Sequence, residues 1–365
     1  MARATVAVVR ATPETVIGDI GRAMSLAGFA AALPKGHPTL LKVNITWHFW
    51  YPACNTTPWQ IAGVAKALLD AGYPRESLAA AHNRTVVVSA RLGERLNKHK
   101  VTTDRLGIPD IHLYEPGEEW VRYEPKASMR VLGDMYPEGL RIPKRLIGAN
   151  IIHLPTVKTH VFTGMTGAMK NAFGGLLFEK RHWTHSVIDE TLVDLLAIQK
   201  EIHPGVFAVM DGTLAGDGPG PRAMRWHEKD LILASADQVA IDAIAAKLMG
   251  FDPLSLPFIR LAHEAGLGVG DVREIEVVGC DISGVNWGFK RGDTLASRGQ
   301  KLIYWGPLHR FEKLLLRTVI VPWSYLASIL YHDVFWYPLV GFWRARRALK
   351  TKWGRLFRNW ERVQP

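Results

Sequence analysis

ANIIHLPTVKTH, residues 149–160, joins an apolar run to a proline and then to a group of polar side chains. The run Ala149–Leu154 predicts a buried β-strand that ends at Pro155. The chain from Pro155 to Gly175 then holds two lysines, a histidine, an asparagine and four glycines. Open α/β sheets bind ligands just beyond the carboxyl ends of their strands, where small residues leave backbone N–H groups accessible. This segment therefore predicts a site that captures an anion.

Strand-like and helix-like patterns alternate through the first 280 residues. Such alternation is typical of an α/β fold with a mainly parallel sheet and helices on both faces, built as one large lobe or two intimate lobes. Residues 1–300 are predicted to form this α/β domain, and residues 301–365 an aromatic and basic helical tail. Residues 109–148 have the weakest pattern, and the short strands expected there lie near 111–114, 119–123 and 129–132.

The composition excludes a disordered chain and an iron–sulfur cluster of the usual kind in this chain. Hydrophobic residues make up 48% of the 365 residues and charged residues 22%, which suits a folded protein. The two cysteines, Cys54 and Cys280, cannot supply the four thiolates of a typical cluster. The first ten residues lack a long apolar core after a basic start, so we expect no secretory signal and a reducing, cytoplasmic location.

The net charge of +11 comes mostly from the end of the chain. Residues 301–365 hold 12 of the 45 Lys and Arg residues but only 3 of the 34 Asp and Glu residues, a net charge of +9. Residues 1–300 are nearly neutral, with a net charge of +2. The basic character therefore belongs to the tail, and we do not expect a nucleic-acid partner, because basic charge alone is poor evidence for one.

Lys42 and Asn44 lie in the predicted strand Leu40–Ile45. A charge inside a buried parallel strand is costly unless it is paired. Two interpretations remain open: an edge strand that turns Lys42 toward water, or a strand whose Lys42 and Asn44 side chains share one face at the carboxyl edge of the sheet. The second interpretation places both residues beside the anion and makes them substrate-binding residues.

The polar segment after Pro155 supplies the other predicted substrate-binding residues. Lys158 and Lys170 would neutralise the anion, because lysine is a point-charge donor suited to phosphate or carboxylate. Asn171 and the backbone around Gly174 would orient the anion. If residues 164–173 are helical, their first amides add to the same site. The alternative is a solvated basic loop that precedes a helix.

Asp211 and His160 are the candidate catalytic residues. Asp211 follows an apolar strand predicted at 206–210, and a loop rich in glycine and proline comes soon after, at 216–221. An acid in this position is suited to act as a general base or a metal ligand, with His160 as its partner in acid–base chemistry. The alternative is a turn in which Asp211 and Asp217 cap backbone amides.

The same acids are also candidate ligands for a divalent metal ion. His182 and His185 are three residues apart and can share a helix face, so with Asp211 and Asp217 they would form a mixed nitrogen and oxygen site. A surface or structural role is the alternative for both histidines. The residues alone leave the reaction and any other cofactor open.

Several motifs occur in order along the chain: Lys42-Val43-Asn44, Pro155–His160, Thr166–Asn171 with Gly174, Asp211-Gly212 with Gly218-Pro219, and Ala236–Asp242 followed by Met249-Gly250. Over roughly residues 40–280 they resemble the family named domain of unknown function 362. Members of that family are often joined to ferredoxin-like iron–sulfur modules, so the resemblance implies redox chemistry or a ferredoxin-like partner. This chain departs from the pattern because it has no cysteine cluster, and Val43 stands where the family often has proline.

The tail is rich in aromatic and aliphatic side chains over residues 302–343, and residues 344–365 then hold eight Arg or Lys against one Glu. The longest uncharged run, 318–331, has fourteen residues, short of the roughly twenty that span a bilayer. Pro322 and Pro338 also interrupt a single span. The pattern predicts a monotopic segment with its apolar face in the membrane and its cations on anionic headgroups. Helices packed on the domain, with a solvated basic end, are the alternative.

These features predict a cytoplasmic enzyme that is peripheral at the inner face of a membrane and bound to the anionic surface through residues 302–365. Its substrate would be an anion bearing phosphate or carboxylate, and a lipid-linked anion would suit the membrane location. The alternative function is a redox accessory or scaffold protein that docks an iron–sulfur partner at a membrane.

Overall fold

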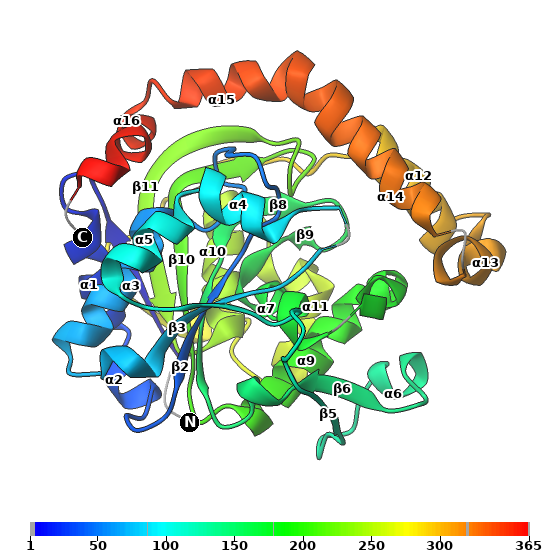
Figure 1. Cartoon of the computed structure of the whole chain (residues 1–365), viewed down its shortest axis with the longest axis horizontal. Helices are drawn as coiled ribbons and strands as arrows, with labels where there is room; N and C mark the ends of the chain where they lie inside the picture. The colour runs from blue at the N-terminus through cyan, green and yellow to red at the C-terminus, as the bar shows by residue number, and fades with distance from the viewer. Residues whose placement is uncertain (1–3, 86, 178, 319–320, 364–365) are drawn as a thin grey trace.

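The computed structural model describes residues 4–85, 87–177, 179–318 and 321–363. It is an α/β fold in which helices cover both faces of a mostly parallel sheet, so the predicted fold class is confirmed. Figure 1 shows this body with the last helices of the chain arching along one side of it. No helix in the described parts of the chain is long and apolar enough to cross a membrane.

One sheet of ten strands forms the centre of the fold. From edge to edge its main path is β12 (Ile275–Gly279), β1 (Ala4–Arg10), β11 (Arg225–Ser235), β10 (Val206–Asp217), β7 (Asn150–Leu154), β2 (Thr39–Val43), β3 (Leu78–His82) and β4 (Asp110–His112). β11 runs antiparallel to both of its neighbours, and the other pairs on this path are parallel. β8 (Thr156–His160) branches off by pairing with β10, and β9 (Gly164–Met165) pairs with β8.

Helices pack on both sides of the sheet because successive side chains of a strand point to opposite faces. In β1, Val6 and Val8 enter one core, and Ala7 and Val9 enter the other. The first core is covered by α7 (Gly167–Asn171), α8 (Phe173–Leu176), α9 (Ile188–Ile202), α10 (Gln238–Met249) and α11 (Pro257–Glu264). The second is covered by α1 (Val16–Leu26), α2 (Phe29–Ala32), α3 (Pro58–Asp70) and α5 (His99–Leu106), with α4 (Ala90–Leu96) beside them.

A separate two-stranded ribbon, β5 (Trp120–Tyr123) with β6 (Leu140–Pro143), lies outside the main sheet. The strand predicted near 129–132 is wrong, because this part of the chain leads into the short helix α6 (Leu132–Met135). The reason is the buried side chain of Asp194. Its carboxylate accepts hydrogen bonds from three successive backbone N–H groups, those of residues 130–132, at 2.8, 3.0 and 3.0 Å. Those N–H groups are therefore not free to pair with another strand.

β10 is much longer than the predicted strand at 206–210, because it continues through Asp217 as one arm of a hairpin with β11. Asp211 therefore lies within a strand rather than at its end. The predicted position relied on Gly212 to end the strand, but the ladder continues past this glycine with a local shift of register between Gly212 and Leu214. Likewise, the chain after Pro155 does not become a loop but forms β8.

The C-terminal segment is helical, as predicted. It contains α12 (Leu295–Tyr304), α13 (Glu312–Arg317), and then an unbroken helix from Pro322 to Ala348. That helix comprises α14 (Pro322–Ile329), the π-helical η7 (Leu330–Gly341) and α15 (Phe342–Ala348). Pro338 was expected to interrupt it, but the helix passes through this proline within its wide π-helical turns.

The last helix, α16 (Lys352–Asn359), holds the end of the tail on the α/β body. Trp353 and Trp360 are 0% and 1% exposed and join the core that α3 covers. Their indole N–H groups donate to Asp230 Oδ1 at 2.6 Å and to Thr102 Oγ1 at 2.8 Å. Both indoles thus bury apolar surface while satisfying their polar atom.

The middle of the tail is held by aromatic side chains that follow β2. Trp47 and Phe49 pack on Tyr337, with ring centroids 5.0 and 4.3 Å apart. The indole of Trp47 also donates to Asp333 Oδ1 at 2.6 Å. The aromatic residues after β2 therefore hold η7 on the body, and Trp336 belongs to the same hydrophobic cluster. The tail is attached at its middle and at its end.

Trp360→Ala should lower the free energy of unfolding by about 3–5 kcal/mol, because it removes a fully buried indole and leaves a cavity. Trp343→Ala is the matched control, since Trp343 lies in the same tail but is 56% exposed. We expect a change within about 0.5 kcal/mol for the control. Denaturant unfolding of the two variants measures both values. Equal losses would show that α16 is not anchored as described.

Candidate functional site

A cavity of about 820 Å³ lies between the carboxyl edge of the sheet and the C-terminal helices. Its floor comes from residues that follow β2, β3, β8 and β10, and from the α7–α8 segment. Its roof comes from the tail, with Tyr304, Trp323, Tyr325 and His332 among the lining residues. This is the position where a sheet of this kind is expected to bind a ligand, and the volume suits a small organic molecule.

The lining is cationic and has no described acid to balance it. Arg84, Lys170, Arg181 and Arg222 line the cavity, and none of the described lining residues is Asp or Glu. Arg222 has a buried Nη1 without a hydrogen-bond partner among the described residues. Asp333 acts on Arg222 from outside the lining, but no carboxylate among the described residues lines the partly dry space itself, and such a lining suits an anion.

Lys42 adds a further buried positive charge beneath the cavity. It is buried in β2, and its Nζ donates to Val43 O at 2.7 Å and to Asn83 Oδ1 at 2.8 Å. Asn83 in turn lines the cavity. The alternative of a lysine facing water is therefore wrong, and Lys42 sits at the carboxyl edge as the other interpretation requires. It reaches the cavity only through Asn83.

Burial and mutual repulsion make these cations easy to deprotonate. Burial, with a smaller contribution from Arg181, lowers the pKa of Lys42 to about 7. The same two causes, in the same order, lower the pKa of Lys170 to about 7. Burial also lowers the pKa of Arg181 to about 10. The Nζ of Lys170 lies over the Phe173 ring, 4.9 Å from its centroid, which is weak compensation for the lost water.

His160 lines the cavity as a neutral imidazole with a defined tautomer. Its Nδ1 accepts from the backbone N–H of Phe162 at 3.2 Å and of Thr163 at 3.4 Å, so the ring proton sits on Nε2. Burial first, then the charge of Lys170, holds the pKa of His160 well below its usual range. His160 is therefore set up to donate a hydrogen bond to an anion.

Two further histidines share these surroundings. His185 lines the cavity, and burial together with the charge of Lys170 lowers its pKa to about 3. His332, from the roof, has its pKa lowered to about 4 by burial and by Arg222. Both rings are neutral at physiological pH, so the positive charge in the cavity comes from the lysines and arginines.

Asn44, Asn171 and Gly174 also line the cavity. The Nδ2 of Asn171 is engaged with the Lys42 carbonyl oxygen at 2.8 Å, so this side chain positions β2 as well as facing the cavity. Asn44 Nδ2 donates to Cys54 O at 3.1 Å. Gly174 allows close packing, since a Cβ there would lie 2.8 Å from the Asn83 amide. These three predicted residues are thus brought together with Lys170 and His160.

Lys158 and Asp211 are placed elsewhere. Lys158 is fully buried in β8, where its Nζ donates to Cys54 O at 2.7 Å and to Thr156 Oγ1 at 3.0 Å. Asp211 accepts from Thr57 Oγ1 at 2.5 Å and from Trp59 Nε1 at 2.8 Å. Neither residue lines the cavity. The structure therefore corrects the predicted pairing of Asp211 with His160, because Asp211 instead ties β10 to the start of α3.

The first amides of α7 are occupied by a side chain of the protein itself. Asp242 of α10 accepts from the N–H groups of Ala168 at 2.5 Å and Met169 at 3.0 Å. Gly167 permits this approach because it has a φ of +71° and a Cβ would lie 2.3 Å from Asp242 Oδ2. The sequence had suggested that these amides bind the anion. Because Asp242 already occupies them, they are not available to a ligand.

The predicted metal residues do not form a group. Asp217 contacts His227, with 2.9 Å between Oδ1 and Nε2, and it lies apart from Asp211. The Nε2 of His182 is 2.9 Å from Leu316 O, which links η3 (Glu179–Val187) to the tail. In the described parts of the chain, the side chains that converge with metal-ligand spacing are instead His82, Glu94 and His112.

Several lining residues were missed by sequence reasoning. Asn83 and Arg84 follow β3 directly, so their position after a strand was a usable signal. Arg222 ends the loop rich in glycine and proline and was detectable in the same way. His332 comes from the tail, and no local pattern indicates that the tail returns to the sheet edge.

The comparisons with known proteins agree with the predicted resemblance. The family model described as Domain of unknown function (DUF362) matches residues 39–247. The protein named thylakoid-associated protein sll1697, from Synechocystis sp. (strain ATCC 27184 / PCC 6803 / Kazusa), is 30% identical over 254 residues, which are 66% of this chain and 72% of that protein. The matched family region holds the floor of the cavity and stops before the helices that roof it. The chain belongs to the DUF362 family.

Proposed function

We propose that this protein is an enzyme of a membrane surface that binds an amphipathic anion, such as a phosphate- or carboxylate-bearing lipid-linked molecule. The observation that carries the proposal is a cavity with uncompensated cations on its floor and apolar helices of the tail as its roof. The cations of the floor suit the charged group. The aromatic side chains of the roof suit an apolar chain.

An exposed apolar face on the long tail helix supports a membrane location. Its exposed large apolar side chains recur mostly three or four residues apart, with two adjacent pairs; they are Trp323, Leu326, Leu330, Val334, Phe335, Leu339, Phe342 and Trp343. Phe335 and Leu339 are 60% and 70% exposed. A contiguous exposed face of this kind marks an interaction surface, because isolated apolar residues do not recur along one side of a helix.

The chemistry next to this face favours an anionic membrane over a protein partner. The helix ends in the basic residues of α15, and the separate helix α16 follows; they hold Arg346, Arg347, Arg355 and Arg358 after the apolar stretch. An apolar face beside a cluster of cations suits the boundary between acyl chains and anionic headgroups. The name of the Synechocystis relative, which associates that protein with thylakoids, agrees with a membrane location.

The apolar face and the cavity share residues. Trp323 is exposed on the helix and also lines the cavity, and Leu295 at the start of α12 does the same. A ligand taken from the membrane would therefore enter between these side chains with its apolar chain toward the tail. Its anionic group would then meet Lys170, Arg181 and the N–H of His160. We propose His160 as the hydrogen-bond donor or acid of the reaction.

We place the protein on the cytoplasmic side, at the inner face of the membrane. The ferredoxin-like partner and the associated redox chemistry remain predictions from the sequence. The cavity favours the enzyme, because an uncompensated internal anion site is of no use to a scaffold that only docks a partner at its surface.

Lys170→Met should weaken the binding of decyl phosphate at least tenfold, because it removes a cation from the floor of the cavity. Isothermal titration calorimetry at pH 7 measures this, with decanol as the ligand that lacks the charge. Lys66→Met is the control, since Lys66 is an exposed lysine paired with Asp70. Equal affinities of wild type and Lys170→Met for decyl phosphate would refute the anion site.

Anion binding should weaken as pH rises from 6 to 9, because Lys42 and Lys170, each with a pKa of about 7, lose their protons over this range. Decanoate is the suitable ligand, since its carboxylate stays ionised throughout. Binding at pH 8 should take up protons, which titrations in buffers of different ionisation enthalpy detect.

The ligand-free protein should show the opposite trend in stability. Its unfolded lysines bind more protons than the folded ones above pH 7, so thermal stability should rise with pH there.

Phe335→Ser combined with Leu339→Ser should abolish most of the binding to vesicles that contain phosphatidylglycerol, as measured by co-sedimentation. Ile147→Ser is the control, because Ile147 is an exposed apolar residue on another part of the surface. Wild type should bind pure phosphatidylcholine vesicles less well, since these lack the anionic headgroup. If the face instead pairs two copies of the chain, wild type will be a dimer without lipid and the double variant a monomer with undiminished vesicle binding.

A further inference from the structure

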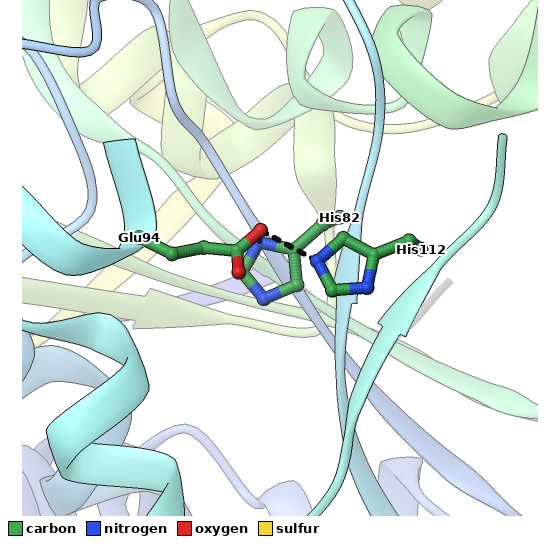
Figure 2. A group of neighbouring side chains, drawn as sticks. All are labelled: His82, Glu94 and His112. Carbon is green, nitrogen blue, oxygen red and sulfur yellow. Dashed lines mark hydrogen bonds and ion pairs between the residues drawn. The ribbon is translucent and has the colours of Figure 1, made fainter. Parts of the chain in front are cut away.

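Three buried side chains converge on the far side of strands β3 and β4 from the cavity. His82 ends β3, His112 ends β4, and Glu94 comes from α4 (Figure 2). Glu94 Oε1 lies 2.7 Å from His112 Nε2 and 3.3 Å from His82 Nδ1. All three residues are buried, and the potential ligand atoms lie within 4.8 Å of one another.

The orientation of His82 is fixed by a second carboxylate. His82 Nε2 lies 3.0 Å from Asp110 Oδ1, and the other oxygen of Asp110 accepts from Thr103 Oγ1 at 2.8 Å. A carboxylate is an acceptor, so Nε2 carries a proton, and in the neutral ring Nδ1 then presents a lone pair toward Glu94. Among the described residues, His82 Nδ1 is buried without a hydrogen-bond partner. A carboxylate behind a histidine, with the other ring nitrogen left free, is the usual support of a metal-binding histidine.

The spacing of the two rings agrees with a shared ion. With Zn–N bonds of about 2.0–2.1 Å and tetrahedral angles, two bound imidazoles have ring centroids about 5 Å apart and ligand atoms about 3.4 Å apart. The His82 and His112 centroids are 5.1 Å apart, and the His82 Nδ1 to Glu94 Oε1 distance is 3.3 Å. The distance from Glu94 Oε1 to His112 Nε2, 2.7 Å, must lengthen by about 0.7 Å on this geometry.

A shared proton is the competing explanation for the cluster. A single hydrogen bond from His112 satisfies Glu94, and it accounts for the 2.7 Å contact. It leaves His82 Nδ1 unused, although Asp110 and the packing hold that lone pair toward the carboxylate. An ion that replaces the His112 proton would use all three groups at once.

We propose that His82 Nδ1, Glu94 and His112 Nε2 bind a divalent transition-metal ion, with Zn²⁺ as the ion that suits them best. Two imidazoles and one carboxylate are ligands that zinc accepts, whereas Mg²⁺ and Ca²⁺ prefer oxygen ligands. A water molecule completes a tetrahedral site in such three-ligand sets. The proposed ligands are different residues from the predicted set of Asp211, Asp217, His182 and His185.

The ion would act on the edge of the sheet rather than in the cavity. β4 is the edge strand and only three residues long, and the ion would tie it to β3 and to α4. Asn83, the residue after His82, holds Lys42 through its side chain. The metal would thus stiffen the strand end that supports the anion site, while its own ligands point to the opposite side of the sheet.

The test uses the full chain with any affinity tag removed, treated with a chelator and then dialysed. Titration with Zn²⁺ should show one site per chain, and Co²⁺ should give the visible absorption bands of a tetrahedral site in the wild type. Glu94→Gln and His112→Gln should each weaken binding at least 100-fold. Asp110→Asn should weaken it about 10–100-fold, because it removes only the orienting carboxylate. His227→Gln is the control, since His227 also pairs with a carboxylate but outside the cluster.

The wild-type measurements keep the proposal testable even if a variant misfolds, which circular dichroism of each variant detects. Zinc should raise the melting temperature of wild type and of His227→Gln but not of Glu94→Gln. The proposal is overturned if wild type binds neither Zn²⁺ nor Co²⁺ at micromolar concentrations. It is also overturned if folded Glu94→Gln and His112→Gln bind zinc as wild type does. Vesicle binding does not enter this test, so its result is independent of the proposed function.

Discussion

The desolvation of Lys42, Lys170 and Arg181 is the constraint on which the rest of the structure depends. Each cation loses water on folding, and the described residues around the cavity offer no carboxylate in return. Such an arrangement lowers stability, because it removes water from charged groups without pairing them with an opposite charge. Gly174 packs closely against Asn83, and Asn83 accepts a hydrogen bond from Lys42. These contacts hold the Lys42 side chain in place despite the loss of stability.

The tail completes this arrangement because it is held on the body near its start, at its middle and at its end, while one side of its long helix stays exposed. Trp353 and Trp360 fill a core position, and Tyr337 stacks on Phe49, so the helix cannot turn its outer face inward. The inner face of the same helix closes the cavity over the cations. The position of the helix from Pro322 to Ala348 therefore accounts both for the exposed apolar face and for the closed polar cavity. The proposed membrane contact and the proposed ligand access would therefore both depend on the placement of this helix.

The sequence was sufficient for the fold class and for much of the cavity floor, and its failures have identifiable causes. Alternating patterns and strand ends predicted that His160, Lys170 and Asn171 lie at the edge of the sheet, and these three residues line the cavity there. Asp211 was misplaced because a glycine after an apolar run suggests a strand end, whereas partner-strand pairing carries the hairpin past it. The cluster of His82 with Glu94 was missed because its members lie on separate elements, and only tertiary packing brings them together.

The state of His160 follows from the same cations and determines what the site can do. Without an anion, the charge of Lys170 and the buried position keep the ring neutral, and the backbone N–H groups at Nδ1 fix the proton on Nε2. An anion that neutralises Lys170 removes one of the charges that oppose protonation of His160 and raises the proton affinity of both side chains. Ligand binding would therefore move the site toward its protonated form. If His160 is the acid of the proposed reaction, protonation that depends on the anion would avoid the cost of a permanently buried imidazolium beside Lys170.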